Sequence, residues 1–226
     1  MNLIAAIFAA ALSLHAGAAI VVTEVMSDSS HPGGTNNGDW FELTNSGATS
    51  VDITGWTWDD ASAVPGSANF GSISSIGAGQ SIIVTAESTS KEADWIIDWG
   101  ISNSVPVVNL GGSNFEGFDA PGDSLNIYNA NDEIVTNATF GDATAGSTFE
   151  WDTSGVSLGI SVSGENGAFV AVQNGKTSGE GPGTDIGSPG IAAIPEPSSC
   201  LLIGISLTIL MTFRKRTAGS SNPMAG

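Results

Sequence analysis

Apolar and polar residues alternate along most of the middle of the chain with a period of two, the period of a half-buried β-strand. The clearest case is residues 39–56, DWFELTNSGATSVDITGW, in which alternating segments lie on both sides of Asn45-Ser46-Gly47. Asn and Gly tolerate positive φ angles and Ser forms local hydrogen bonds, so these residues favour a tight turn. We therefore expect two short strands joined as a β-hairpin, and we take this hairpin as the seed of an all-β core.

Other short segments rich in β-branched and aromatic residues are separated by turn-forming residues, a pattern typical of a β-sandwich or barrel. We expect strands at residues 20–26, 70–76, 81–86, 105–110, 124–128, 133–140, 149–151 and 168–173. Residues 91–100 are expected to form a short helix, because Trp95 and Trp99 are spaced to share one face. Residues 174–190 are rich in Gly, Pro, Ser and Thr, and we interpret them as the exit from the domain and the start of a linker.

The amino-terminal residues 1–19, MNLIAAIFAAALSLHAGAA, contain an apolar run of the length found in secretory signal peptides, followed by small residues. The segment departs from the usual pattern in having no Lys or Arg before the apolar run. A buried strand or helix start is the alternative interpretation. We expect export, with cleavage near Ala18 or Ala19 and a mature domain over residues 20–190.

The carboxyl-terminal residues form three successive parts. Residues 191–197 are a linker that ends in Pro195-Glu196-Pro197, residues 198–213 are uncharged and mostly apolar, and residues 214–226 begin with Arg214-Lys215-Arg216. As a helix, the 16-residue apolar run would extend about 24 Å, against roughly 30 Å for the hydrocarbon core of a bilayer. It would span only with flanking residues or local thinning, leaving the basic cluster in the cytoplasm. A buried core helix is the alternative.

The order Pro195-Glu196-Pro197, short hydrophobic span, and Arg214, Lys215 and Arg216 resembles the PEP-CTERM sorting signal. The resemblance implies that an exosortase, a membrane transpeptidase-like protease, processes the chain near the PEP motif. It also implies a bacterium that makes exopolysaccharide or floc. The protein would then be anchored at the cell surface by its transmembrane helix or be released into the extracellular matrix after processing.

Charge and cysteine content exclude several kinds of binding site. The formal net charge is −18, and residues 20–194 hold 22 acidic residues against only Lys91 and Lys176. Such a surface repels phosphate backbones, which argues against nucleic-acid binding, while it is compatible with divalent cations. The single cysteine, Cys200, lies in the apolar run, so the domain has neither a disulfide nor a cysteine-based metal site.

Several motifs of the middle region occur in an order found in one known family. They are TEVM (23–26), DWFELTN (39–45), VDITGW (51–56), GAGQSIIV (77–84), ADW (93–95), DWG (98–100), DSLNIY (123–128) and GSPG (187–190). This order resembles the lamin-tail domain, which is found in bacterial surface proteins as well as in nuclear lamins. The resemblance implies an immunoglobulin-like β-sandwich over residues 20–190. It also implies a binding and structural module without catalytic residues. Residues 61–70 and 109–120 have no clear counterpart.

Carboxylates are the main candidates for chemistry, since His15 falls in the signal peptide and His31 stands alone in a loop. Carboxylate oxygens suit Ca²⁺, although neither of the two clusters has EF-hand spacing. The candidate Ca²⁺ ligands are Asp59, Asp60, Glu116, Asp119 and Asp123. A solvated loop face is the plainer interpretation, and a glycosidase-like carboxylate pair is a further alternative.

Trp58 is the preferred candidate for stacking on a sugar ring, because it directly precedes Asp59-Asp60 and Trp rings often contact ligands. Core packing is the more common role of Trp. The polar residues of the hairpin, Asp39, Glu42, Asn45 and Asp52, are expected to be strand-end and turn residues. We therefore expect any binding surface on the loops after Trp56.

Together these patterns predict an exported, surface-sorted structural or adhesive module of the bacterial cell envelope or exopolysaccharide matrix. It would have no enzymatic activity and no cofactor. Its partners would be an exosortase, the membrane through the carboxyl-terminal helix, and extracellular polysaccharide, but no nucleic acid. The alternative is a Ca²⁺-dependent carbohydrate-binding module of the extracellular matrix, and a hydrolase with paired carboxylates is a third hypothesis.

Overall fold

The computed structural model describes residues 20–29, 38–86, 92–111, 115, 117–173 and 183–192. The chain divides into two compact units, Met1–Ala193 and Ile194–Gly226, and the described residues all belong to the first. The predicted signal peptide, PEP motif, transmembrane segment and basic cluster lie outside the described residues. Among the residues that are described, no helix is both long enough and apolar enough to cross a membrane.

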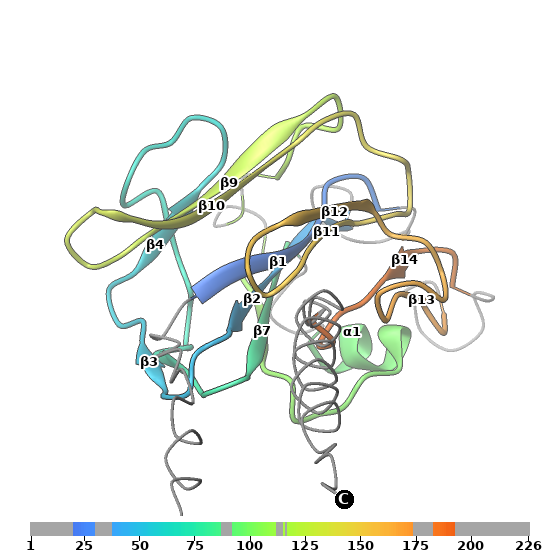
Figure 1. Ribbon diagram of the computed structural model, residues 1–226, viewed down its shortest axis with the longest axis horizontal. Coiled ribbons are helices and arrows are strands. Elements are labelled where there is room, and N and C mark those ends of the chain that lie inside the picture. Colours follow the sequence, from blue (N-terminus) through green and yellow to red (C-terminus); the bar gives the residue numbers. More distant parts are fainter. Residues whose placement is uncertain are drawn as a thin grey trace, which may run out of the picture. The chain divides into compact units, whose positions relative to one another are not determined.

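The larger sheet has six strands in the order β12-β11-β1-β2-β7-β8 (Figure 1). The strands are β1 (Ile20–Met26), β2 (Trp40–Asn45), β7 (Ser81–Thr85), β8 (Val107–Asn109), β11 (Phe149–Trp151) and β12 (Ser157–Ile160). All pairs are antiparallel except β7 and β8, which are parallel. The connection between β7 and β8 contains the helix α1 (Glu92–Trp99), as a parallel pair needs a crossover.

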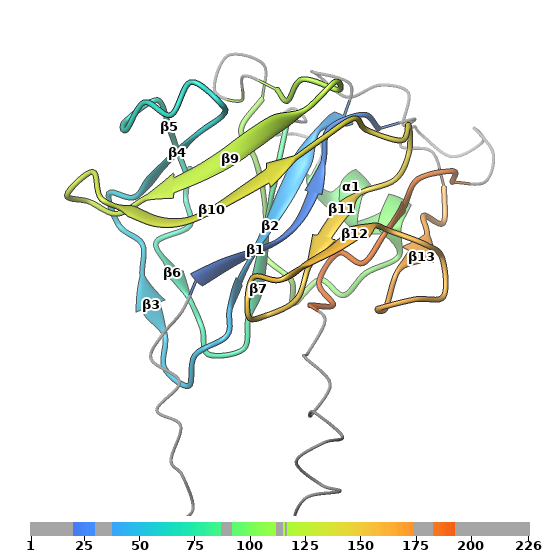
Figure 2. The same ribbon diagram turned by 45° about the horizontal axis from the view of Figure 1, so that its top comes forward.

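The smaller sheet has four strands in the order β10-β9-β4-β5 (Figure 2). They are β4 (Thr57–Asp59), β5 (Ala68–Asn69), β9 (Asp123–Tyr128) and β10 (Ile134–Phe140). Two short ribbons accompany the sheets. One pairs β3 (Val51–Asp52) with β6 (Ser75–Ile76), and the other pairs β13 (Phe169–Val170) with β14 (Ile186–Gly187). The chain is therefore an all-β sandwich with one helix in its described part.

The main core lies between the two sheets and is rich in aromatic side chains. Phe41 of β2 and Trp58 of β4 pack edge to face, with ring centroids 5.0 Å apart. Phe115 and Phe118 fill the space beside them, and Phe115 lies 4.7 Å from Trp58 between centroids. Val22 and Val25 of β1 both enter this core, although they are three residues apart, because a β-bulge between Val22 and Glu24 shifts the alternation of the strand.

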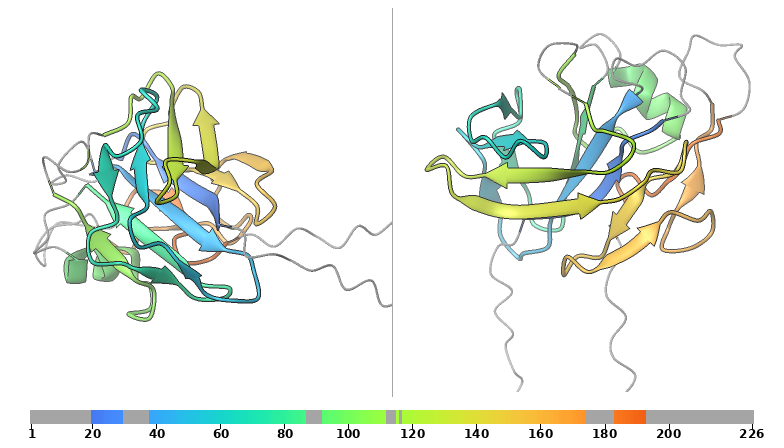
Figure 3. Two further views of the ribbon diagram at one scale, coloured as in Figure 1. Left: turned by 90° about the vertical axis from the view of Figure 1, so that its left-hand side faces the viewer. Right: turned by 90° about the horizontal axis from the view of Figure 1, so that it is seen from above.

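A second core covers the opposite face of the larger sheet, which lies between α1 and the smaller sheet in the left panel of Figure 3. Trp40 of β2 lies between Trp95 and Trp99 of α1, with centroid distances of 5.5 Å to each and edge-to-face geometry. Met26 and Ile83 complete this cluster. Because both faces of the sheet are covered, every residue of β2 is buried, whatever its polarity.

The predicted β-hairpin at residues 39–56 is wrong in its pairing. β2 pairs with β1 and β7, whereas β3 pairs with β6, so the turn after Asn45 carries the chain between two different sheets. The turn itself is present. The Asn45 side chain accepts a hydrogen bond from the Gly47 amide at 2.9 Å and donates to the carbonyls of Thr49 and Ile76. Local alternation identified the strands, but long-range packing selected their partners.

Other expectations are confirmed or corrected by the structure. The predicted helix forms at α1, and Trp95 and Trp99 share a buried face, with centroids 5.8 Å apart. The strands expected at residues 124–128 and 133–140 form β9 and β10, which pair antiparallel. In contrast, the expected linker is wrong at its end, because residues 183–192 contain β14 and bond to the rest of the domain. The strand β12 was not predicted at all.

Candidate functional site

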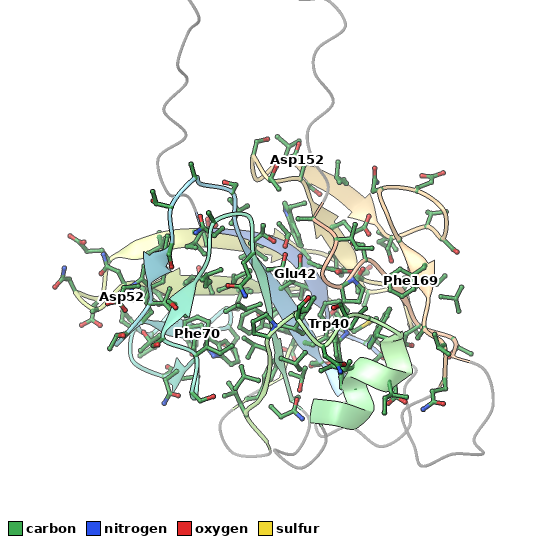
Figure 4. The ribbon with its side chains drawn as sticks, turned by 90° about the horizontal axis from the view of Figure 1, so that it is seen from below. Trp40, Glu42, Asp52, Phe70, Asp152 and Phe169 are labelled. Carbon is green, nitrogen blue, oxygen red and sulfur yellow. The ribbon has the colours of Figure 1, made fainter. Side chains whose placement is uncertain are left out.

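Three glutamates lie side by side across three neighbouring strands. Glu24 of β1 is directly opposite Glu42 of β2 on one side and Glu150 of β11 on the other. Their exposed fractions are 0%, 1% and 3%, respectively. We call Glu42, Glu24 and Glu150 the glutamate row. Figure 4 shows Glu42 and Trp40 in the view from below, near the labelled Phe169.

Local sequence explains why these acids share a face. Each follows or precedes residues that enter the main core, as Phe41 and Leu43 do around Glu42, and Phe149 and Trp151 around Glu150. Alternation then directs the glutamates to the opposite face. In β1 a register shift between Val22 and Glu24 marks a β-bulge that changes the phase of the alternation, so that Thr23 and Glu24 both lie on the face of the glutamate row.

Residues 183–192, which we call the closing segment, cover the glutamate row. The Ser188 amide donates to Glu24 Oε1 at 2.6 Å, and the Gly190 amide donates to Glu42 Oε2. The Thr148 hydroxyl donates to the same Glu24 oxygen at 2.6 Å. A Cβ atom added to Gly187 would lie 2.5 Å from Glu24 Oε1, so only glycine permits this close approach.

Two hydroxyl groups on the sheet also donate hydrogen bonds to Glu42. The Thr23 hydroxyl donates to Glu42 Oε1 at 2.6 Å, and the Thr44 hydroxyl donates to the same oxygen at 3.2 Å. Glu42 therefore accepts bonds on both oxygens. In contrast, Glu24 Oε2 and Glu150 Oε1 are buried and have no hydrogen-bond partner.

Burial shifts the ionisation of the row. It raises the pKa of Glu24 well above its ordinary value, and the neighbouring Glu42 charge adds to the shift, while the bonds from Thr148 and Ser188 oppose it. Burial also raises the pKa of Glu42 and of Glu150. The described residues contain no Lys or Arg that could supply a counter-charge. Folding therefore favours the protonated form of each carboxyl relative to an exposed glutamate.

Asp39 is a fourth buried acid, at the start of β2. Its Oδ2 accepts a 2.7 Å hydrogen bond from the Phe118 amide, whereas its Oδ1 is buried without a partner. Burial raises the pKa of Asp39 to about 7, and repulsion from Asp28 and Asp123 contributes. Asp39 therefore ties the larger sheet to the loop that carries Phe118 into the core.

The structure does not assemble the predicted Ca²⁺ ligands into a metal site. Asp59 Oδ2 accepts bonds from the Ser62 hydroxyl at 2.5 Å and the Val64 amide at 2.6 Å. Asp123 accepts from the Ala61 amide at 3.0 Å and from the Asp119 amide at 2.9 Å. These oxygens hold loops together.

The remaining predicted ligands also contribute nothing to a metal site in the described chain. Asp60 accepts from the Ser62 amide at 2.8 Å, which makes it a turn residue. Asp119 gives its amide rather than its carboxylate to Asp123. Glu116 lies outside the described residues. Within the described ranges, no group of three or more His, Cys, Asp or Glu side chains could hold a metal ion.

The prediction that Trp58 stacks on a sugar is wrong. Its exposed fraction is 1%, and its ring is enclosed by Phe41, Phe115 and Phe118. The ring therefore belongs to the core and is not presented on the loop that follows β4. Trp40, Trp95, Trp99 and Trp151 are buried as well.

A shallow hollow of about 460 Å³ lies beside the closing segment. Its walls include Ile101, Val105, Phe169, Pro189 and Ile191, and none of the described residues that line it carries a carboxylate. Glu24 and Glu42 bond instead to backbone amides of the closing segment and hold it on the sheet.

Sequence reasoning missed the glutamate row. Glu24, Glu42 and Glu150 each stand inside a run of apolar and aromatic residues, in VTEVM, WFELT and TFEW. An acid that alternates with apolar residues is also the ordinary pattern of a strand with one solvated face, so the sequence does not show that this face is covered. The prediction that Glu42 is a strand-end residue is wrong, whereas Asn45 and Asp52 are turn residues as expected.

The fold and the site together define a small all-β sandwich whose buried acids join the sheet to its carboxyl-terminal segment. The Lamin Tail Domain family model matches residues 13–142, more than half of the chain, and the protein belongs to the lamin tail domain family. No curated protein matches the chain. The match ends before β11, so Glu150 and the closing segment lie beyond the matched residues.

Proposed function

We propose that this lamin tail domain protein is a non-enzymatic structural or adhesive module of the bacterial cell envelope or exopolysaccharide matrix. The proposal is based mainly on the way in which the closing segment covers the glutamate row. Glu24 and Glu42 accept hydrogen bonds from the closing segment, and all three acids of the row have exposed fractions of 3% or less. Carboxylates used in this way support a rigid scaffold rather than turnover of a substrate.

The sequence at both ends supports export and surface sorting. The apolar run of residues 1–19 would direct secretion, and Pro195-Glu196-Pro197 would be recognised by an exosortase. Residues 198–213 would hold the chain in the membrane before processing, with Arg214, Lys215 and Arg216 on the cytoplasmic side. The acidic domain would then lie at the cell surface or in the surrounding matrix.

Replacement of Pro195-Glu196-Pro197 by three alanines tests the sorting step. We expect the variant to remain in the membrane fraction at its unprocessed length, while the unaltered protein is shortened and reaches the surface. A matched control replaces Ser221-Asn222-Pro223, also in the tail, and should be processed normally. Normal processing of the Pro195-Glu196-Pro197 variant in a host with an active exosortase would rule out this signal.

The alternative of a Ca²⁺-dependent carbohydrate-binding module finds no support from the residues first assigned to it. Trp58 is enclosed in the core, and Asp59 and Asp123 bond to loop amides. We therefore retain the structural or adhesive role. A pull-down with purified exopolysaccharide from the host distinguishes an adhesive domain, which is retained, from one that only spaces other surface components.

A further inference from the structure

The edge strand β12 presents an unusual surface. It ends the six-stranded sheet, and its outer side is not paired with another strand of the described chain. All four of its residues are exposed. Alternate residues from 156 to 162 are apolar and exposed, with fractions of 59% for Val156, 38% for Leu158, 37% for Ile160 and 52% for Val162.

The strand has few of the features that normally protect a sheet edge. Proteins guard such edges with charged side chains, proline or bulges. Residues 153–164 contain no charged residue and no proline, although residues 20–194 hold 22 acids. The one protective feature is a bulge, where the register shifts between Glu150 and Trp151 and Gly159 adopts a φ of 91°. This segment is therefore where two acidic domains could approach with the least repulsion.

The sequence of the edge is nearly the same in both directions. Residues 156–162 read V-S-L-G-I-S-V, with Gly159 at the centre. In an antiparallel pair of two such strands, Leu158 lies opposite Ile160 of the second copy, and Val156 lies opposite Val162. Apolar residues then meet apolar residues at these positions, and a two-fold axis passes near Gly159, as a self-complementary dimer requires.

The face of the sheet at Gly159 is uncovered in the described chain. No atom of the domain outside the immediate chain neighbours lies within 4 Å of the position that a Cβ of Gly159 would occupy. The described domain therefore places no side chain over the centre of the proposed pairing. The position of β12 beside β11, on the side away from β1, can be followed in Figure 2.

We propose that β12 pairs antiparallel with β12 of a second copy of this protein, about a two-fold axis at Gly159, and joins the two larger sheets into one. This contact does not depend on the surface-sorting proposal. Backbone hydrogen bonds supply the attraction and the matched apolar residues set the register, as in other cases of strand addition. Repulsion between the acidic domains makes the pairing weak at low salt and stronger as salt screens the charges.

Disulfide crosslinking of the full chain in lipid vesicles tests both the contact and its register. In a Cys200→Ala background, one chain carries Leu158→Cys and the other carries Ile160→Cys. We expect the mixture to crosslink several-fold faster than either variant alone, because only the mixed pair places the two sulfurs directly opposite each other. Val64→Cys, at another exposed valine, controls for random collision.

A second pair of variants separates strand pairing from association through the membrane segment. Ser157→Asp adds a charge to the exposed edge, where the aspartate can still accept from the Gly159 amide as Ser157 does. We expect it to abolish the preferential crosslinking of the mixture. Ile134→Asp, on the exposed edge strand β10, should leave that crosslinking unchanged.

Two results would overturn the proposal. One is a mixture that crosslinks no faster than the single variants or Val64→Cys, which would mean that β12 is free or is covered by a different partner. The other is preferential crosslinking that survives Ser157→Asp, which would show that another surface brings the strands together. Thermal unfolding of each variant checks that all of them are folded before these rates are compared.

Discussion

Glu24 and Glu42 lie directly opposite each other on β1 and β2, both fully enclosed and both bonded to amides of the closing segment. Two like charges in such positions would repel strongly in a low-dielectric interior. Protonation of either carboxyl would relieve that repulsion, and a protonated oxygen can also donate a hydrogen bond. The closure of the domain is thereby linked to the pH of its surroundings.

Acidification from pH 8 to pH 5 is expected to stabilise the domain. Carboxyls with a pKa raised by folding bind more protons in the folded state, so the free energy of unfolding rises as pH falls. For Asp39, whose pKa moves from 3.8 to about 7, the gain develops between about pH 7 and pH 4. Urea unfolding across this range measures the effect.

Urea unfolding of two variants shows whether the glutamate row causes this pH dependence of stability. Glu42→Gln should flatten the curve, because it removes one raised pKa and the charge that raises the pKa of Glu24. Asp142→Asn, at an exposed position, should leave the curve unchanged. Stability that falls steadily from pH 8 to pH 5 in the unaltered protein would show that the row is ionised in the folded state.

Gly187→Ala should loosen the closing segment. The added Cβ would lie 2.5 Å from Glu24 Oε1, 3.1 Å from Thr148 Cγ2 and 3.2 Å from the Trp99 ring. We expect a loss of about 1–3 kcal/mol in the free energy of unfolding, as for overpacking in a core. Gly141→Ala is the matched control, since no atom lies within 4 Å of its added Cβ. Equal stability of both variants would contradict the close packing of Gly187 against Glu24.

Trp58→Ala is expected to destabilise the domain. Removal of a ring enclosed by Phe41 and Phe115 is expected to cost about 3–5 kcal/mol, measured by denaturant unfolding. Trp58→Phe should cost less because it keeps most of the apolar volume. A stable Trp58→Ala variant that loses only polysaccharide binding would restore the sugar-stacking hypothesis.

Calcium is expected to leave the melting temperature unchanged. A ligand that binds only the folded state raises the melting temperature, and the Asp59 and Asp123 oxygens are already bonded to loop amides. Thermal unfolding in EDTA and in millimolar CaCl₂ measures this. An increase in the melting temperature on addition of CaCl₂ that is lost in Asp59→Asn would overturn the expectation. Magnesium at the same concentration controls for general charge screening.

Much of the fold could be predicted because its signals are local. Alternation placed β1, β2, β7, β9 and β10, the i, i+4 spacing of Trp95 and Trp99 placed α1, and the order of motifs indicated the lamin tail domain family. Strand partners could not be predicted in the same way. The segment after Asn45 pairs with β6 because its apolar residues pack there, a contact that no local pattern encodes.

The candidate site shows the same limit more sharply. Glu42 belongs to an alternating strand, and that alternation shows only that its side chain faces away from Phe41 and Leu43. Whether this opposite face meets water or protein depends on α1 and on residues 183–192, the latter more than 140 positions further along the chain. The same uncertainty led to Trp58 being assigned to a surface.

By itself, the sequence determined the strands β1, β2, β7, β9 and β10, the position of the helix, the acidic character of the domain and its family, since each depends on local composition or motif order. Only the tertiary structure decided that both faces of the larger sheet are covered, that three glutamates are enclosed together, and that β12 has no further strand partner within the described residues. Burial is a property of contacts between distant segments, and it sets both the pKa of a carboxyl and the accessibility of a strand.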